Sequence, residues 1–131
     1  MKANDFGMYR ALPGVPYDEA VQRVEEALKQ EGFGILTRID VRETLKQKID
    51  VDFRPYVILG ACNPPLAHRA LSAEDTIGLM LPCNVVVSAT DSGSEVAIAK
   101  PEVMLQVADA EGLQEVAEEA QSRLERALES V

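Results

Sequence analysis

Apolar residues recur at helical spacing in two long segments of the chain. In residues 113–128 an apolar stripe lies opposite an acidic face, which is typical of a helix packed on a core. In residues 17–31 the apolar positions follow steps of four, three and four, again one helical face: Tyr17, Val21, Val24 and Leu28. The pattern predicts two amphipathic helices.

Shorter apolar segments between these helices predict strands. Residues 7–12 and 95–100 have the length and composition of strands, and residues 33–39 are expected to place Phe33, Ile35, Thr37 and Ile39 on one face. Residues 56–62 are apolar on both faces, which favours an interior strand. Residues 76–90 form a second apolar run, in which Pro82 marks a bulge, a bend or an edge position.

Two short helices are predicted from their caps. Asp40 and Glu43 resemble a capping box at the start of a helix that extends to about Lys48. Asn63 and Pro64 suit the cap and the first position of a helix over residues 66–72. Residues 101–107 fit either a strand or a helical turn.

The order of these elements predicts the fold class. We expect an α+β, two-layer sandwich in which a mostly antiparallel sheet carries two long helices on one face. The 131 residues suit a single domain over residues 1–131. The predicted strand 95–100 has no polar residue between its terminal charges, so it would be a poorly protected sheet edge. A two-fold homodimer is therefore expected.

The charge of the chain narrows the classes of partner. The formal net charge is −9, and no cluster of lysine and arginine is present. Nucleic acids and anionic membrane surfaces are polyanions, so neither is an expected partner. No apolar run approaches the roughly 20 residues that span a bilayer, and the amino terminus lacks the apolar stretch of a secretory signal. A cytoplasmic location is expected.

The candidate functional residues of the chain cluster in a pair of mirrored cysteine motifs, Ala61-Cys62-Asn63-Pro64 and Leu81-Pro82-Cys83-Asn84. Each motif combines a strand-breaking proline and a polar amide with the thiol, which is a poor way to fill a core. If the two strands are neighbours, Cys62 and Cys83 could bind a soft metal or form a reversible redox pair. Backbone N–H groups at the start of the Pro64 helix would then lower the pKa of a nearby thiol.

Other residues could complete a site around the thiols. His68 is the single histidine, and it could serve as a third ligand or as a general base. Tyr56, with Arg54 and Arg38, could supply polar contacts at the mouth of a pocket. The candidate ligand-binding residues are Cys62, Asn63, Cys83, Asn84, Tyr56 and His68, with Cys62 and Cys83 as candidate metal ligands. No cofactor is identified, and the chain has no Gly-x-Ser-x-Gly elbow or glycine-rich phosphate loop.

Three functions remain open for these residues. The first is a non-enzymatic module that binds a small ligand or a soft metal around Cys62 and Cys83. The second is a thiol-based redox protein or enzyme that uses either cysteine. The third is a structural subunit in which both cysteines are inert core residues.

Six motifs along the chain carry a family resemblance. They are Gly32-Phe33-Gly34, Ile39-Asp40-Val41, Asp52-Phe53-Arg54-Pro55-Tyr56, Leu59-Gly60-Ala61-Cys62-Asn63-Pro64, Ala70-Leu71 and Leu81-Pro82-Cys83-Asn84-Val85. Together they resemble the domain-of-unknown-function family 302, from about residue 7 to the carboxyl end. The resemblance implies a two-layer α/β fold similar to one repeat of the TATA-binding protein, and it implies neither DNA binding nor any particular activity. The family's motif residues correspond to Tyr56, Cys62, Asn63, Pro64, Pro82, Cys83 and Asn84.

Overall fold

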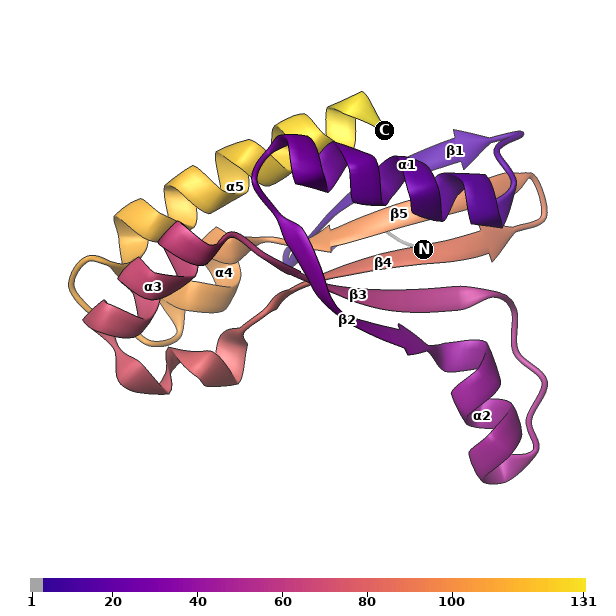
Figure 1. The fold of residues 1–131 in the computed structure, drawn as a ribbon, viewed down its shortest axis with the longest axis horizontal. Helices are drawn as coiled ribbons and strands as arrows, with labels where there is room; N and C mark the ends of the chain where they lie inside the picture. The colour runs from indigo at the N-terminus through magenta and orange to yellow at the C-terminus, as the bar shows by residue number, and fades with distance from the viewer. Residues whose placement is uncertain (1–3) are drawn as a thin grey trace.

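The computed structural model describes residues 4–131, and residues 1–3, which bear on the expected absence of a secretory signal, lie outside the described residues. Strands and helices alternate through most of the described chain (Figure 1). The elements are β1 (Gly7–Pro13), α1 (Tyr17–Gln30), β2 (Gly34–Asp40), α2 (Val41–Ile49), β3 (Tyr56–Cys62), α3 (Pro64–Ala73), the 3₁₀ helix η1 (Asp75–Met80), β4 (Cys83–Thr90), β5 (Gly93–Ala99), α4 (Pro101–Gln106) and α5 (Leu113–Ser130).

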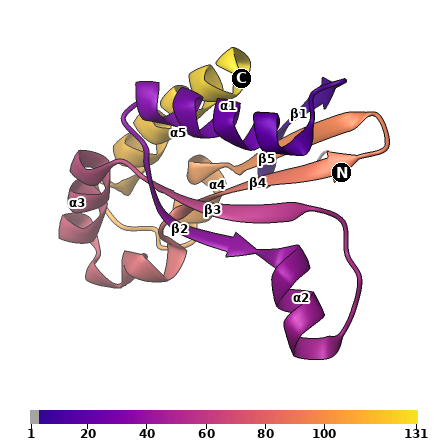
Figure 2. The ribbon, with the colours of Figure 1, turned by 45° about the vertical axis from the view of Figure 1, so that its right-hand side comes forward.

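The five strands of the described chain form one sheet in the order β1-β5-β4-β3-β2. All four neighbouring pairs are antiparallel, as predicted. The two long helices, α1 and α5, lie together on one face of this sheet, as Figures 1 and 2 show. The α+β, two-layer architecture expected from the pattern is therefore confirmed.

The core lies between the sheet and the two long helices. In β3, β4 and β5, alternate residues point to this side and are almost fully buried, as the period of two in a strand requires. The apolar stripes of α1 and α5 cover them, and Val24 and Leu124 are among the most buried side chains of the helices. The strand residues that face the helices include Val57, Leu59, Val85, Val87, Val96 and Ile98.

The apolar run predicted over residues 76–90 is not one strand. Residues Asp75–Met80 form η1, and β4 begins only at Cys83. Pro82, which has no N–H for a sheet ladder, directly precedes the strand, and its peptide bond with Leu81 is cis. Cys83 is therefore the first residue of its strand, where the sequence placed it in the middle of one.

The predicted alternation along residues 33–39 is also wrong. Phe33 is buried in the turn before β2, and Gly32 ends the α1 turn with a positive φ of 84°. The register of β2 against β3 shifts between Ile35 and Thr37, which indicates a bulge. The extra residue moves Ile39 to the opposite face from Ile35, so the four apolar positions do not share one face.

The strand expected to be an exposed edge, residues 95–100, lies in the sheet interior. β5 pairs with β1 on one side and with β4 on the other, and β1 and β2 are the edges. The backbone groups of β5 are consequently used within the chain, which removes its unprotected edge as a reason for expecting a dimer. The ambiguous residues 101–107 form a helix, α4.

No helix among residues 4–131 combines the length and the apolar character needed to cross a membrane.

Candidate functional site

The two cysteine motifs meet where β3 ends and β4 begins. In the antiparallel register Ala61 pairs with Cys83 and Gly60 pairs with Asn84, so the predicted adjacency of the two strands is confirmed. Strand spacing and rise place the α-carbons of Cys62 and Cys83 about 6 Å apart. A mostly helical excursion of the chain, residues 63–82, separates the cysteines in sequence only.

The sheet register shows that the two thiols are not a cross-strand pair. Cys83 shares a sheet face with Ala61, whereas Cys62, one residue further along β3, falls on the opposite pleat. Both cysteines are free. This offset disfavours a disulfide between Cys62 and Cys83, because the residues bridged across neighbouring strands normally lie directly opposite one another.

Both thiols nevertheless line one cavity, because the cavity opens at the end of the sheet. It has a volume of ≈ 300 Å³, and its walls come from β2, α3, η1, α4, α5 and the ends of β3 and β4. Apart from Asn63 and the thiols its side chains are apolar. At its boundary Leu36 and Leu71 are 67% and 42% exposed. The other lining residues are Phe33, Ala61, Leu66, Ala67, Ala70, Gly78, Leu81, Pro82, Pro101, Leu105, Val116 and Ala120.

Asn63 holds the first turn of α3 beside this cavity. Its Oδ1 accepts a hydrogen bond from the Leu66 backbone N–H at 3.2 Å, and the residue is 6% exposed. Pro64 follows at the first position of the helix, as the sequence predicted. A Cβ on Gly32 would lie 2.9 Å from Asn63 Nδ2, so the turn that ends α1 packs closely against this cap.

Replacing Asn63 with alanine should lower the free energy of unfolding by about 1 kcal/mol, because the Leu66 N–H loses its partner. Urea denaturation measures this loss. Asn84→Ala is the matched control, since Asn84 adjoins the other cysteine and is exposed; its effect should stay within about 0.5 kcal/mol. If Asn63→Ala keeps full stability but loses ligand binding, Asn63 is a ligand contact and not a structural cap.

The environment of both thiols favours the protonated form. Burial raises the pKa of the Cys62 thiol above its ordinary value. Burial raises the pKa of Cys83 to about 11, and the neighbouring Cys62 contributes to the rise. The expectation that the start of α3 would lower a thiol pKa is therefore wrong. Desolvation by burial is the largest cause of the shift at both thiols.

The structure does not bring the other predicted site residues to this cavity. His68 lies on the exposed side of α3 and does not line it. Asn84 is exposed and borders a smaller neighbouring hollow. Tyr56 lies at the opposite end of β3, where it packs against Phe53 with ring centroids 5.9 Å apart. Arg54 stacks on the same aromatic pair and donates to Ser88 Oγ at 2.8 Å.

The donor set around the cavity is small. Within residues 4–131 there is no group of three or more histidine, cysteine, aspartate or glutamate residues that could hold a metal ion. Cys62 and Cys83 alone could provide two sulfur ligands. Such a pair suits soft ions that accept few ligands better than Zn²⁺, which normally takes four.

Sequence reasoning missed most of the cavity wall. Val116 and Ala120 belong to the apolar stripe of α5, which predicts core positions equally well. Leu105 and Pro101 lie in α4, whose secondary structure the sequence left open. In the folded chain, the exposed side chains of Leu36 and Leu71 do mark the cavity, because large apolar residues at a surface often border an interaction site.

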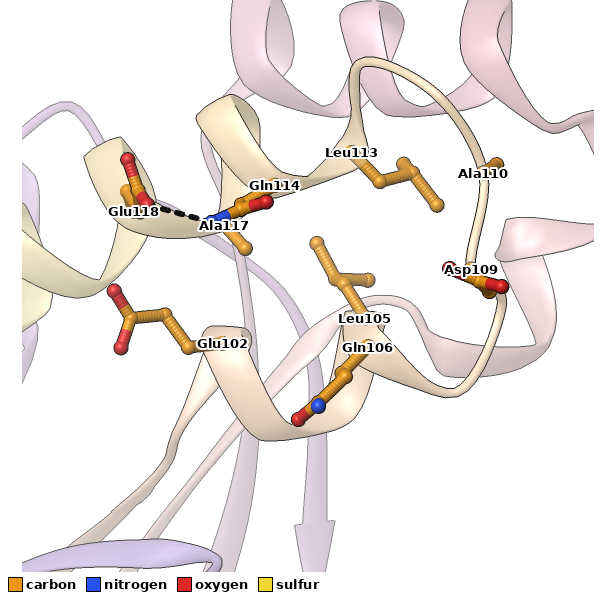
Figure 3. Close-up of a pocket in the computed structure, with 9 residues that line it drawn as sticks. All are labelled: Glu102, Leu105, Gln106, Asp109, Ala110, Leu113, Gln114, Ala117 and Glu118. Atoms are coloured by element: carbon orange, nitrogen blue, oxygen red, sulfur yellow. Dashed lines mark hydrogen bonds between the residues drawn. The ribbon is translucent and has the colours of Figure 1, made fainter.

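A second hollow lies between α4 and α5 and contains neither motif. It has a volume of ≈ 440 Å³, and Leu105 and Leu113 extend into it from the two sides (Figure 3). Its charged residues, Glu102, Asp109 and Glu118, are exposed, and Glu118 accepts a hydrogen bond from Gln114 at 3.2 Å. The hollow is therefore a solvated groove with an acidic rim.

Comparisons with known proteins agree with the motif pattern. A family model described as "Domain of unknown function DUF302" matches residues 9–131. A similar solved structure is the crystal structure of an uncharacterized conserved protein DUF302 from Bacillus stearothermophilus. It shares 34% sequence identity, covers 95% of this chain and 97% of its own, and superposes with a TM-score of 0.86. No curated protein matches the chain.

Proposed function

The chain belongs to the DUF302 family, and we propose that it binds a small apolar molecule, without catalysis, in the cavity between its two cysteine motifs. The observation that carries this proposal is the convergence of both motifs on one apolar cavity of ≈ 300 Å³. That volume lies at the lower end of the range for small-molecule sites. A ligand of this kind would be held mainly by burial of its apolar surface.

The chemistry of the thiols supports binding over catalysis. A nucleophilic cysteine needs a lowered pKa or a base within hydrogen-bond reach. Here the pKa values of Cys62 and Cys83 are raised, and His68 does not line the cavity. Neutral thiols are small, polarisable groups, and they would contact an apolar ligand as part of the wall.

The boundary of the cavity supports an apolar ligand as well. Leu36 on the edge strand β2 and Leu71 on α3 are both exposed next to the opening. A ligand longer than the cavity would cover these two side chains and remove them from water. Because Leu36 and Leu71 are already partly buried, covering the rest of each would contribute less than the roughly 1.5–3 kcal/mol of a leucine taken fully out of water.

A soft metal ion is the second candidate, and the shared cavity of Cys62 and Cys83 is the observation that favours it. The ion would bind the two thiolates, so both protons must leave. Because the pKa of each thiol is raised, the affinity for metal would increase steeply with pH through the neutral range. Binding of an apolar molecule would not depend on pH in this way.

Titration of the ¹⁵N-labelled protein with 1-hexanol tests the proposal by NMR. We expect saturable shifts at residues that line the cavity, and we expect Ala67→Leu to weaken binding at least about tenfold by filling it. Ala73→Leu is the matched control, because it makes the same change on the exposed end of α3, outside the cavity. Shifts that do not saturate, or an affinity that Ala67→Leu leaves unchanged, would contradict the proposal.

A parallel titration with Cu(I) at pH 6 and pH 8 distinguishes a soft-metal site from a site for an apolar molecule. A soft-metal site requires tighter binding at the higher pH and loss of binding in both Cys62→Ala and Cys83→Ala. Hexanol binding should survive each of these substitutions, because alanine preserves the apolar wall.

A further inference from the structure

The face of the sheet opposite the long helices carries an unbroken apolar row. The strand registers align Tyr9, Ala97, Val86, Ile58 and Ile39 side by side across β1, β5, β4, β3 and β2. The first four are partly buried and Ile39 is 48% exposed. These five residues, called the open-face row below, lie on the opposite pleat from the core residues of the same strands.

The rows on either side contain a single charged strand residue, and the Arg54 guanidinium covers the end of one row, where it donates to Ser88 Oγ. One side carries the small or uncharged residues Gly7, Ala99, Asn84, Gly60 and Thr37, and the other carries Ala11, Glu95, Ser88 and Tyr56. Glu95 is the one acid among these positions of the described strands. The open-face row itself is apolar apart from the Tyr9 hydroxyl, so covering it removes few polar groups from water.

No long helix within residues 4–131 covers this face. Figures 1 and 2 show α1 and α5 on the other side of the sheet, whereas α2 projects alone on the open side, beyond the end of β2. α2 has nine residues and none of them is buried. An isolated helix of this length is marginal in water, so packing against a partner would add stability to the Asp40 cap of α2. Ile49, at its end, is 62% exposed.

The charge distribution indicates what can cover the face. In the helix layer, α1 carries four acids against two bases, and α5 carries five acids against two bases. Two copies of a chain with net charge −9 repel most strongly through that layer. They can approach through the open face, where the row is apolar and therefore complementary to itself.

The size of the face suits a dimer. Five strands at a spacing of about 4.8 Å and seven residues at about 3.4 Å give a surface of roughly 24 by 24 Å, or about 570 Å². α2, which projects on the same side beyond the end of β2, would extend this area toward the roughly 800 Å² per partner of a standard interface. A smaller face would not support a stable dimer.

We propose that the open face binds a second copy of the chain about a two-fold axis, with the two open-face rows packed against each other. Sheets packed in this way lie about 10 Å apart, with their side chains interdigitated. α2 of each chain then lies at the rim of the interface, where Ile49 is covered. The acidic helix layers point outward on both sides, so the charge opposes growth beyond the dimer.

Sedimentation equilibrium of the full chain tests this interface. The wild-type protein should have twice the 14.3 kDa mass of one chain at micromolar concentration. Ala97→Glu, at the centre of the face, should weaken association roughly 100-fold, because it places a carboxylate in a desolvated interface. Ala73→Glu makes the same substitution on the exposed end of α3 and should leave the dimer intact.

Circular dichroism would reveal whether Ala97→Glu misfolds. A second variant, Ile49→Glu, keeps the proposal testable in that case. Ile49→Glu alters a helix without buried residues, so the fold should persist while the dimer weakens. Dissociation of either folded face variant supports the proposal. A wild-type mass of one chain at every concentration would overturn it. A dimer that neither Ala97→Glu nor Ile49→Glu weakens would also overturn it, and would point to the edge strands β1 and β2.

Discussion

Replacing Gly60 with alanine should destabilise the protein by about 1–3 kcal/mol, although the change adds a single methyl group. The new Cβ would meet Thr37 Oγ1 from β2, and it would lie 2.7 Å from Cγ of Pro82. A threonine side chain can rotate, but the proline ring cannot, so the backbone around the second cysteine motif must move. Urea denaturation measures the loss.

Gly34→Ala is the control for Gly60→Ala. Gly34 lies in the neighbouring strand β2, and a Cβ there would have no atom within 4 Å. Its effect on the free energy of unfolding should stay within about 0.5 kcal/mol. Equal stability of the two variants would mean that Pro82 does not pack on β3. The Gly60–Pro82 contact would then not be what holds the second cysteine motif against β3.

Cys83 should resist alkylation at mildly alkaline pH. Its pKa is raised from an ordinary 9.0 to about 11, so the thiolate fraction at pH 8 is roughly a hundredfold lower than that of an ordinary thiol. Iodoacetamide labelling followed by peptide mass spectrometry should therefore modify Cys83 far more slowly than a free thiol. In urea Cys62 and Cys83 should react at the same rate. Rapid labelling of native Cys83 would instead support a thiol-based enzyme.

The same pKa shift makes stability depend on alkaline pH. Because folding raises the pKa of Cys83, the native state holds the proton more tightly than the unfolded state does. This contribution is fully present below about pH 9 and is lost as the pH rises from about 9 to about 11, by up to about 3 kcal/mol. Cys83→Ala should remove this part of the decline, and an identical decline in the variant would contradict the assignment.

Local sequence patterns were sufficient to predict the helices with a periodic apolar stripe and the helices that begin with a capping residue. The stripes of α1 and α5 follow from the spacing of their apolar residues, and both helices pack where the spacing predicts. Asp40 Oδ1 accepts from the Glu43 N–H at 2.9 Å, which confirms the predicted cap of α2. Asn63 caps α3 in the same way. These features depend on residues only a few positions apart.

Features that depend on distant pairing could not be predicted in this way. The position of β5 inside the sheet follows from its pairing with β1, which lies at the other end of the chain. The bulge in β2 is visible only against β3, since the sequence of β2 by itself fits a regular alternation. The run through Leu79 and Leu81 is apolar enough for a strand, but no neighbouring strand pairs with it.

The candidate site shows the same division. The mirrored motifs pointed to Cys62 and Cys83, and the pairing of β3 with β4 confirms that the two cysteines are neighbours. The cavity between them is built by α3, η1, α4 and α5, which pack against one another only in the folded chain. Proximity in sequence did not place His68 in the site. It lies only six residues after Cys62, but the intervening turns of α3 put its side chain on the exposed side of that helix.

The excursion between the two cysteines, residues 63–82, leaves the sheet at β3 and returns at the adjacent strand β4. Its two ends are fixed by the sheet, so insertions or deletions within it change the cost of closing the loop only slowly with length. It supplies Leu66, Leu71 and Leu81 to the cavity while contributing nothing to the register of the strands. Changes to this segment can therefore reshape the cavity wall without shifting the strand register, provided that its buried residues Leu66, Ala70 and Ile77 keep their packing.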